Sequence, residues 1–144
     1  MAHRVRRCFL LVVLTAALLA LTACGEDEEG SATMRPGEAC LACHTDGGEA
    51  PAFAFAGTVF TTAGGQTGAT GVTVKVVDGG STTVEVTTNS AGNFSSRAPL
   101  TAPLTLTLTS PGGATATMGL AAAHGDCNLC HASGGVVGSP LVAP

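Results

Sequence analysis

The sequence has no tryptophan and no tyrosine, and only five of its 144 residues are phenylalanines. Such a chain has no platform on which bases or sugars can stack. Basic residues are also scarce, because six Lys and Arg stand against ten Asp and Glu and give a formal net charge of -4. Recognition of nucleic acid relies on positive charge that neutralises phosphates, so the composition argues against a nucleic-acid partner.

Charge of either sign is rare, at 11% of residues, which separates this chain from disordered and highly charged proteins. The length allows one small domain with appendages. The middle of the chain, 55–119, lacks a Ser-His-Asp set, a phosphate-binding loop and a cluster of carboxylates. The sequence therefore gives little support to an enzyme of those common classes.

A hydrophobic run near the start is the first positive feature. The 13 mostly apolar residues 9–21 follow three arginines, and the run is shorter than the ~20 residues of a membrane span. This pattern is typical of a secretory signal peptide. Its end, Leu21-Thr22-Ala23-Cys24, resembles the lipobox of bacterial lipoproteins. The resemblance implies a signal peptide over 1–23 and a lipid anchor at Cys24; a plain signal peptide or an uncleaved anchor is the alternative.

The segment that follows the lipobox is acidic. Residues 26–29 read Glu-Asp-Glu-Glu, which indicates a flexible solvated tether over 24–36. Gly25 directly follows Cys24. In enterobacterial lipoproteins an Asp at this position resembles a signal for retention in the inner membrane. We therefore expect an outer-membrane or cell-surface lipoprotein that faces the periplasm or the exterior, not a cytoplasmic protein.

Apart from Cys8 and Cys24, the cysteines form two pairs with identical spacing. The two stretches are Cys40-Leu41-Ala42-Cys43-His44 and Cys127-Asn128-Leu129-Cys130-His131. Both resemble the C-x-x-C-H attachment motif of c-type cytochromes. One helical turn sets two thiols against one porphyrin edge, and the following histidine can reach the iron. The resemblance implies two haem c groups, bound covalently at the four cysteines, with His44 and His131 as proximal iron ligands.

Other uses of the two pairs stay open. Four thiols could hold zinc, form disulfides or act in thiol redox chemistry. A zinc site does not explain the histidine after both pairs, and a thioredoxin-type site needs a βαβ pattern that is absent. The alternatives are a zinc- or disulfide-stapled surface-binding lipoprotein without a redox role, and a peroxidase-like haem enzyme with an open axial site.

Distal iron ligands are few. After removal of 1–23 one further histidine remains, His124, within Ala121-Ala122-Ala123-His124-Gly125. The alanines and the glycine predict a short helix and its end, and His124 is a distal candidate. Met118 is a weaker distal candidate, because a methionine at the end of a strand-like run more often packs in a core.

Between the two motifs the sequence alternates with a period of two. Alternation is clear in three stretches, 72–77, 83–87 and 104–109, where Val or Leu alternates mostly with Thr. Glycine-rich turns separate the stretches, so six or seven short strands and an antiparallel β-sandwich are expected. We predict Thr faces in water and Val, Leu and Phe faces in the core.

The same region carries a second resemblance. Phe55-Ala56-Gly57-Thr58-Val59, then Gly71-Val72-Thr73-Val74, then Thr88-Asn89-Ser90-Ala91-Gly92-Asn93-Phe94 resemble the carboxypeptidase regulatory-like, transthyretin-like domain. The resemblance implies a binding or structural module without catalytic residues, with Phe94 in the core. An immunoglobulin-like sandwich is the structural alternative.

Together these features predict a mainly β chain, with a small sandwich flanked by two C-x-x-C-H loops that contain short helical turns. The expected organisation is a signal peptide over 1–23, a tether over 24–36, the first haem segment over 37–54, the sandwich over 55–119, and the second haem segment with the C-terminal tail over 120–144. We expect partly exposed haems on loops at the ends of the sandwich. The expected function is one-electron transfer with redox partner proteins.

Overall fold

The computed structural model describes residues 31–48 and 50–144, so the expected signal peptide, Cys24 and most of the tether lie outside the described residues. The elements are η2 (Cys40–Ala42), β1 (Phe55–Phe60), β2 (Thr73–Val77), β3 (Thr83–Thr87), β4 (Asn93–Ser96), β5 (Thr105–Thr109), β6 (Thr115–Thr117), α2 (Cys127–Cys130) and β7 (Leu141–Val142). In this part of the chain no helix is long and apolar enough to cross a membrane.

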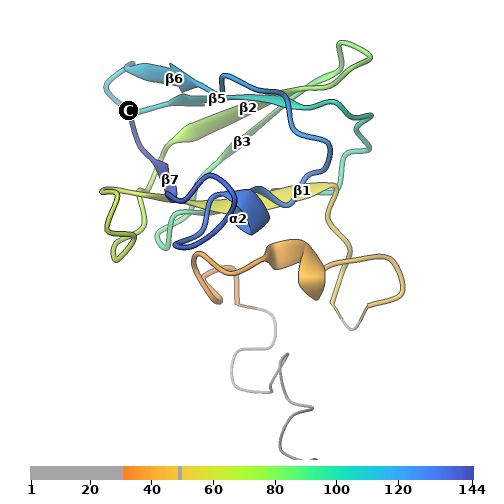
Figure 1. The fold of residues 1–144 in the computed structure, drawn as a ribbon, viewed down its shortest axis with the longest axis horizontal. Helices are drawn as coiled ribbons and strands as arrows, with labels where there is room; N and C mark the ends of the chain where they lie inside the picture. The colour runs from red at the N-terminus through yellow and green to blue at the C-terminus, as the bar shows by residue number, and fades with distance from the viewer. Residues whose placement is uncertain (1–30, 49) are drawn as a thin grey trace, which may run out of the picture.

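The strands form two sheets that face each other across a common core (Figure 1). The larger sheet has the order β3-β2-β5-β6 and is antiparallel throughout. The smaller sheet has the order β4-β1-β7, in which β4 is antiparallel to β1 and β7 is parallel to it. The prediction of a mainly β, two-sheet sandwich is confirmed.

The four-stranded sheet follows the alternation seen in the sequence. In β2, Val74 and Val76 are buried and Lys75 is exposed. In β5, Leu106 and Leu108 are buried between threonines that are exposed or partly exposed. Side chains two residues apart share one face of a strand, so the apolar face meets the core and the Thr-rich face meets water.

The three-stranded sheet departs from that pattern, because every residue of β1 is buried. Phe55 and Val59 belong to the core together with Phe94 of β4, which confirms the expected place of Phe94. A strand that is buried at successive positions is covered on both faces. In Figure 1 the segment with η2 lies below β1, on the side away from the four-stranded sheet.

Two features of the C-terminal quarter were not expected. The helix predicted over 121–125 is wrong: Ala122 forms an isolated antiparallel bridge with Leu104, through backbone hydrogen bonds of 2.7 and 2.8 Å. Pairing with the edge of the core outweighs the helix propensity of the alanines. In addition, β7 lies within the expected second haem segment and completes the smaller sheet beside β1.

Candidate functional site

Each C-x-x-C-H motif forms one helical turn, a 3-10 turn in η2 and an α-helical turn in α2. The carbonyl oxygen of Cys40 accepts the backbone N–H of Cys43 at 3.3 Å and that of His44 at 3.0 Å. The carbonyl oxygen of Cys127 likewise accepts the backbone N–H of His131 at 2.9 Å. Residues three apart on a helical turn lie on the same side. Each pair of cysteines therefore projects in one general direction, with its histidine at the end of the turn.

The likeness of the two motifs continues past the histidines. Each is followed after two residues by Gly-Gly, at Gly47-Gly48 and Gly134-Gly135. In both turns the N–H of the second glycine donates to the carbonyl oxygen three residues earlier, at 2.9 Å. The first glycine has a positive φ in both, 77° and 84°, a conformation that favours glycine.

The second glycine of each turn is close-packed against the motif itself. A Cβ on Gly48 would lie 2.6 Å from the carbonyl oxygen of Cys43, and a Cβ on Gly135 would lie 2.5 Å from that of Cys130. The structural unit is therefore C-x-x-C-H-x-x-G-G and occurs twice. The repeat is visible in the residues themselves, and the structure adds the close packing of its second glycine.

The two motifs lie beside each other and not at opposite ends of the sandwich as expected. The backbone N–H of Leu41, inside the first motif, donates to Asp126 Oδ2 at 3.1 Å, and Asp126 directly precedes Cys127. The amide of Asn128, inside the second motif, donates to the Glu38 carbonyl oxygen at 2.8 Å. Direct hydrogen bonds thus join the two attachment segments.

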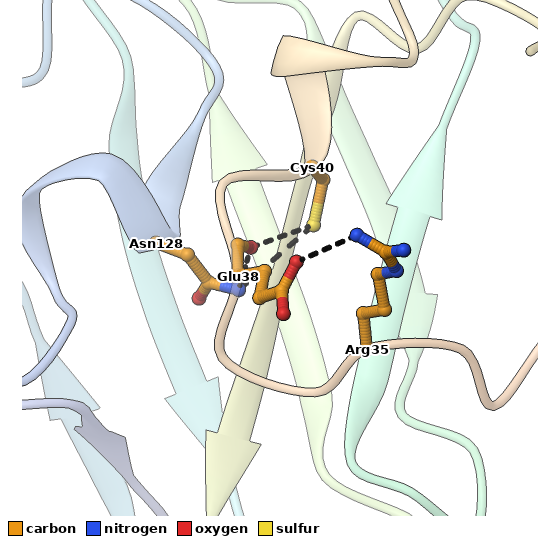
Figure 2. A network of polar contacts seen from close by, with 4 residues as sticks. All are labelled: Arg35, Glu38, Cys40 and Asn128. Carbon is orange, nitrogen blue, oxygen red and sulfur yellow. Dashed lines mark hydrogen bonds and ion pairs between the residues drawn. The ribbon is translucent and has the colours of Figure 1, made fainter. Parts of the chain in front are cut away.

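Figure 2 shows the Asn128 side chain pointing toward the turn that holds Glu38 and Cys40. Asn128 Nδ2 lies 3.9 Å from Cys40 Sγ, and this thiol also lies 3.5 Å from the Glu38 carbonyl oxygen. The ion pair between Arg35 and Glu38, at 3.3 Å, is exposed on the outside of the turn. An exposed pair of this kind contributes little to stability, so the buried amide is the stronger contact.

A buried polar network continues this contact to the sheet. Asn128 is 1% exposed and Thr58 of β1 is fully buried. The backbone N–H of Thr58 donates to Asn128 Oδ1 at 3.0 Å, and the Thr58 hydroxyl accepts the backbone N–H of Gly37 at 2.9 Å. The same hydroxyl donates to Asn93 Oδ1 of β4 at 2.8 Å. Hydrogen bonds thus hold the first motif on β1.

The two expected proximal ligands differ in their surroundings. His44 Nδ1 lies 2.8 Å from the carbonyl oxygen of Pro51. A carbonyl only accepts, so the proton of the neutral ring is on Nδ1 and the lone pair is on Nε2. The ring stacks on Phe53, with centroids 4.2 Å apart. Histidines that bind metals commonly donate their second N–H in this way. His131 is partly exposed at the end of α2.

The two distal candidates occupy different places. His124 is exposed, and its Nδ1 accepts the backbone N–H of Asp126 at 3.3 Å, which leaves the proton of the neutral ring on Nε2. Ligation through Nε2 would require this weak contact to break. Met118 packs against the hydrophobic core, and its N–H donates to the carbonyl oxygen of Leu106 in the larger sheet. A role as distal ligand stays a prediction for both.

The four cysteines of the two motifs are in two different states. Cys40, Cys127 and Cys130 are free, whereas Cys43 is disulfide-bonded. Burial, followed by the charge of Asp126, raises the pKa of Cys40 to about 11 and that of Cys127 to about 12. Both thiols are therefore protonated at neutral pH. Haem attachment at Cys43 would take the place of its disulfide.

The described residues contain no preformed metal cage. Among residues 31–48 and 50–144 no three His, Cys, Asp or Glu side chains are grouped in a way that could hold a metal ion. A Cys₄ zinc site requires four thiols at the corners of a tetrahedron. The two pairs would have to rearrange before they could bind zinc together.

The surface around the second motif is apolar. Leu129 lies within the motif and is exposed, Val136 is 92% exposed, and Val137 is exposed as well. The N–H of Val137 donates to the Cys130 carbonyl oxygen at 3.1 Å, which places these valines beside the motif. Exposed apolar side chains grouped in this way are typical of a surface that a ligand or a partner covers.

No family model, curated protein or solved structure matches the chain. The findings therefore establish a mainly β, two-sheet domain that carries two neighbouring cysteine pairs. Sequence reasoning located the cysteines and histidines but missed Asp126, Asn128 and Thr58. An Asp before the first cysteine of a motif and an Asn after it are visible in the sequence, but no spacing rule marks such residues as contacts between motifs.

Proposed function

We propose that this protein is a dihaem c-type cytochrome that transfers single electrons at or near a bacterial membrane. The observation that carries the proposal is the duplicated C-x-x-C-H-x-x-G-G unit, which forms the same pair of backbone hydrogen bonds, one from its histidine and one from its second glycine, at both sites. A zinc or disulfide role would not require a histidine and a glycine turn after each pair. Covalent haem attachment uses the cysteines and the histidine together.

Several residues of the two motifs support the attachment of haem. Cys40, Cys43, Cys127 and Cys130 would hold the two porphyrins through thioether bonds. At the first site, the Pro51 carbonyl orients the His44 ring and leaves Nε2 available for iron. Haem iron, when bound, supplies the one-electron chemistry, and the protein supplies attachment, axial ligands and surroundings that tune its potential.

The side-by-side arrangement favours electron transfer over a purely structural role. The two attachment turns are linked through Asp126 and Asn128, so two haems held there would be near neighbours. Partial exposure of His44 and His131 suits brief contact with a redox partner protein. The excess of acidic residues would steer a basic partner toward the surface.

A lipid anchor at Cys24 is part of the same proposal. It would keep the protein at the periplasmic or outer surface of the outer membrane. Export would also bring the apo-cysteines to the haem-attachment enzymes, which act outside the cytoplasm. Several acyl chains make a firm anchor, since each buried CH₂ contributes ~0.8 kcal/mol. Replacing residues 1–24 by a cleavable signal peptide without a lipobox should move the protein from the membrane fraction to the soluble fraction without changing its haem content.

The decisive experiment is production of the full chain in a bacterial host that exports it and attaches haem c. Purified protein should show a c-type visible spectrum, and the pyridine haemochrome assay should count two haems per chain. The variant with Cys40→Ala and Cys43→Ala should carry one haem, as should the variant with Cys127→Ala and Cys130→Ala. Gln66→Ala, in an exposed hairpin, is a matched control that should keep two.

The other outcomes separate the remaining functions. A colourless protein with stoichiometric zinc, or with disulfides only, would replace the cytochrome by a stapled surface-binding lipoprotein. Two high-spin haems that turn over peroxide would indicate a peroxidase-like enzyme with an open axial site. His124→Ala should change the spin state of one haem if His124 is a distal ligand, and an unchanged spectrum would remove that assignment.

A further inference from the structure

Asp126 combines burial, charge and an unsatisfied atom in the contact between the two motifs. Its side chain is only 7% exposed. Oδ2 accepts the Leu41 N–H, but Oδ1 is buried and has no hydrogen-bond partner. A buried polar atom without a partner is costly and rare, so it calls for a functional explanation.

The backbone fixes this carboxylate in place. Asp126 forms a parallel bridge with Ala56 of β1, and the preceding carbonyl, of Gly125, accepts the Ala56 N–H at 3.0 Å. A Cβ on Gly125 would lie 2.0 Å from the Ala54 carbonyl oxygen, so only glycine allows so close an approach. The chain therefore reaches Cys127 from a rigid position on the sheet.

The carboxylate is near both attachment sites. It contacts the backbone of Leu41, between the cysteines of the first motif, and it directly precedes the first cysteine of the second motif. Its charge is also one cause of the raised pKa of both Cys40 and Cys127, which agrees with this placement.

We propose that Asp126 is a shared determinant of redox potential, whose buried negative charge lowers the reduction potential of both haems. The inference rests on the proposed function. Ferric haem carries one more positive charge than ferrous haem, so a nearby negative charge favours the ferric state. The effect is larger in a buried site than at the surface, because the surroundings screen the charge less.

The test is a spectroelectrochemical titration of the full-length holoprotein and its Asp126→Asn variant. Asparagine keeps the shape and the acceptor for the Leu41 N–H but removes the charge. Both midpoint potentials should rise. Asp126→Glu keeps the charge and should stay near the wild type, which separates charge from shape. If the Asn variant does not fold, Asp126→Ser provides a second neutral side chain.

A matched control is Asp46→Asn, which removes the same charge from an exposed position two residues after His44. The rise in midpoint potential caused by Asp46→Asn should be much smaller, because solvent and salt screen an exposed charge. The two single-haem variants assign each midpoint to one site. In these variants Asp126→Asn should raise the midpoint potential at each of the two sites.

The outcomes distinguish this inference from the proposed function. Wild-type protein without haem overturns both. Haem-loaded protein whose potentials do not change in Asp126→Asn, or change no more than in Asp46→Asn, overturns only the role of Asp126. A shift at one haem alone also overturns it, because the charge is then not shared.

Discussion

The interior of the sandwich and the contact between the two cysteine motifs are held together by different chemistry. The interior consists of Val, Leu and Phe side chains from both sheets. The motif contact instead depends on a few polar groups, mainly Thr58, Asp126 and Asn128, that hydrogen-bond to backbone. Apolar burial is non-directional, whereas hydrogen bonds require defined geometry.

The core and the motif contact therefore determine different properties of the molecule. A core of many interchangeable apolar contacts tolerates small changes in shape and supplies most of the stability. The polar contact adds less free energy but fixes the position of one motif relative to the other. We therefore expect substitutions in the two regions to affect different properties, namely global stability in the core and local order at the motifs.

The largest effect is expected in the core. Phe94→Ala removes a ring that is 4% exposed and that packs near Phe55, with ring centroids 6.2 Å apart. The loss of free energy of unfolding should be about 3–5 kcal/mol, because burial is lost and a cavity remains. Urea unfolding followed by circular dichroism measures it. Phe53→Ala makes the same change outside the core cluster and should cost clearly less; equal losses would contradict the assignment of the core.

A smaller and more local effect is expected from Asn128→Ala. The change leaves the Thr58 N–H and the Glu38 carbonyl oxygen without the amide, at a cost of about 1–3 kcal/mol. Hydrogen exchange read by mass spectrometry should show faster exchange over 37–41, with β2 and β5 still protected. Gln66→Ala removes an exposed amide and should leave 37–41 unchanged. Uniformly faster exchange throughout the chain would mean that Asn128 supports the whole fold.

The smallest expected effect is a pH-dependent loss of stability when Asp78, in the turn after β2, is replaced. Asp78 accepts the backbone N–H of Thr101 at 2.9 Å and that of Thr82 at 2.7 Å. The bond from Thr101, aided by that from Thr82, lowers the pKa of Asp78 below its ordinary value. The charged form therefore stabilises the fold above the unfolded-state pKa of about 3.9, and this stabilisation is lost as pH falls through the lower folded-state pKa.

Asp78→Asn should accordingly lower the thermal midpoint near neutral pH, and the difference from the wild type should shrink in acid. Thermal unfolding measured at several pH values from about 7 down to about 2 tests this. Asp46→Asn, which removes an exposed carboxylate, should follow the wild-type profile. A difference that is constant over the whole range would show that shape, not charge, accounts for the effect of Asp78.

The sequence predicted those parts of the fold that depend on local patterns. The alternation of Val74 and Val76 with Lys75 identified β2, and the Leu–Thr alternation identified β5. The helix expected around Ala122 was wrong, because pairing with Leu104 is a tertiary contact. The pairing of β7 with β1 was not anticipated either, since two residues carry no periodicity.

The site was predictable in its residues but not in its arrangement. The spacing of the cysteines and histidines identified the motifs directly. Their juxtaposition depends on contacts such as Leu41 with Asp126, which are 85 residues apart, and no local pattern records such a contact. The polar residues that make it were unremarkable in the sequence, because Asp and Asn are common in exposed loops.

The long separation between these partners has a consequence for biogenesis. Glu38 and Asn128 lie 90 residues apart, so the proposed export from the N-terminus would deliver the first motif well before the residues that secure it. Cys40 and Cys43 would then stay accessible to modifying enzymes until the last fifth of the chain had crossed the membrane. The second motif, in contrast, would emerge when β1 is already present to receive it. If both sites take haem as proposed, the first should be loaded ahead of the second, with closure of the protein as the final step.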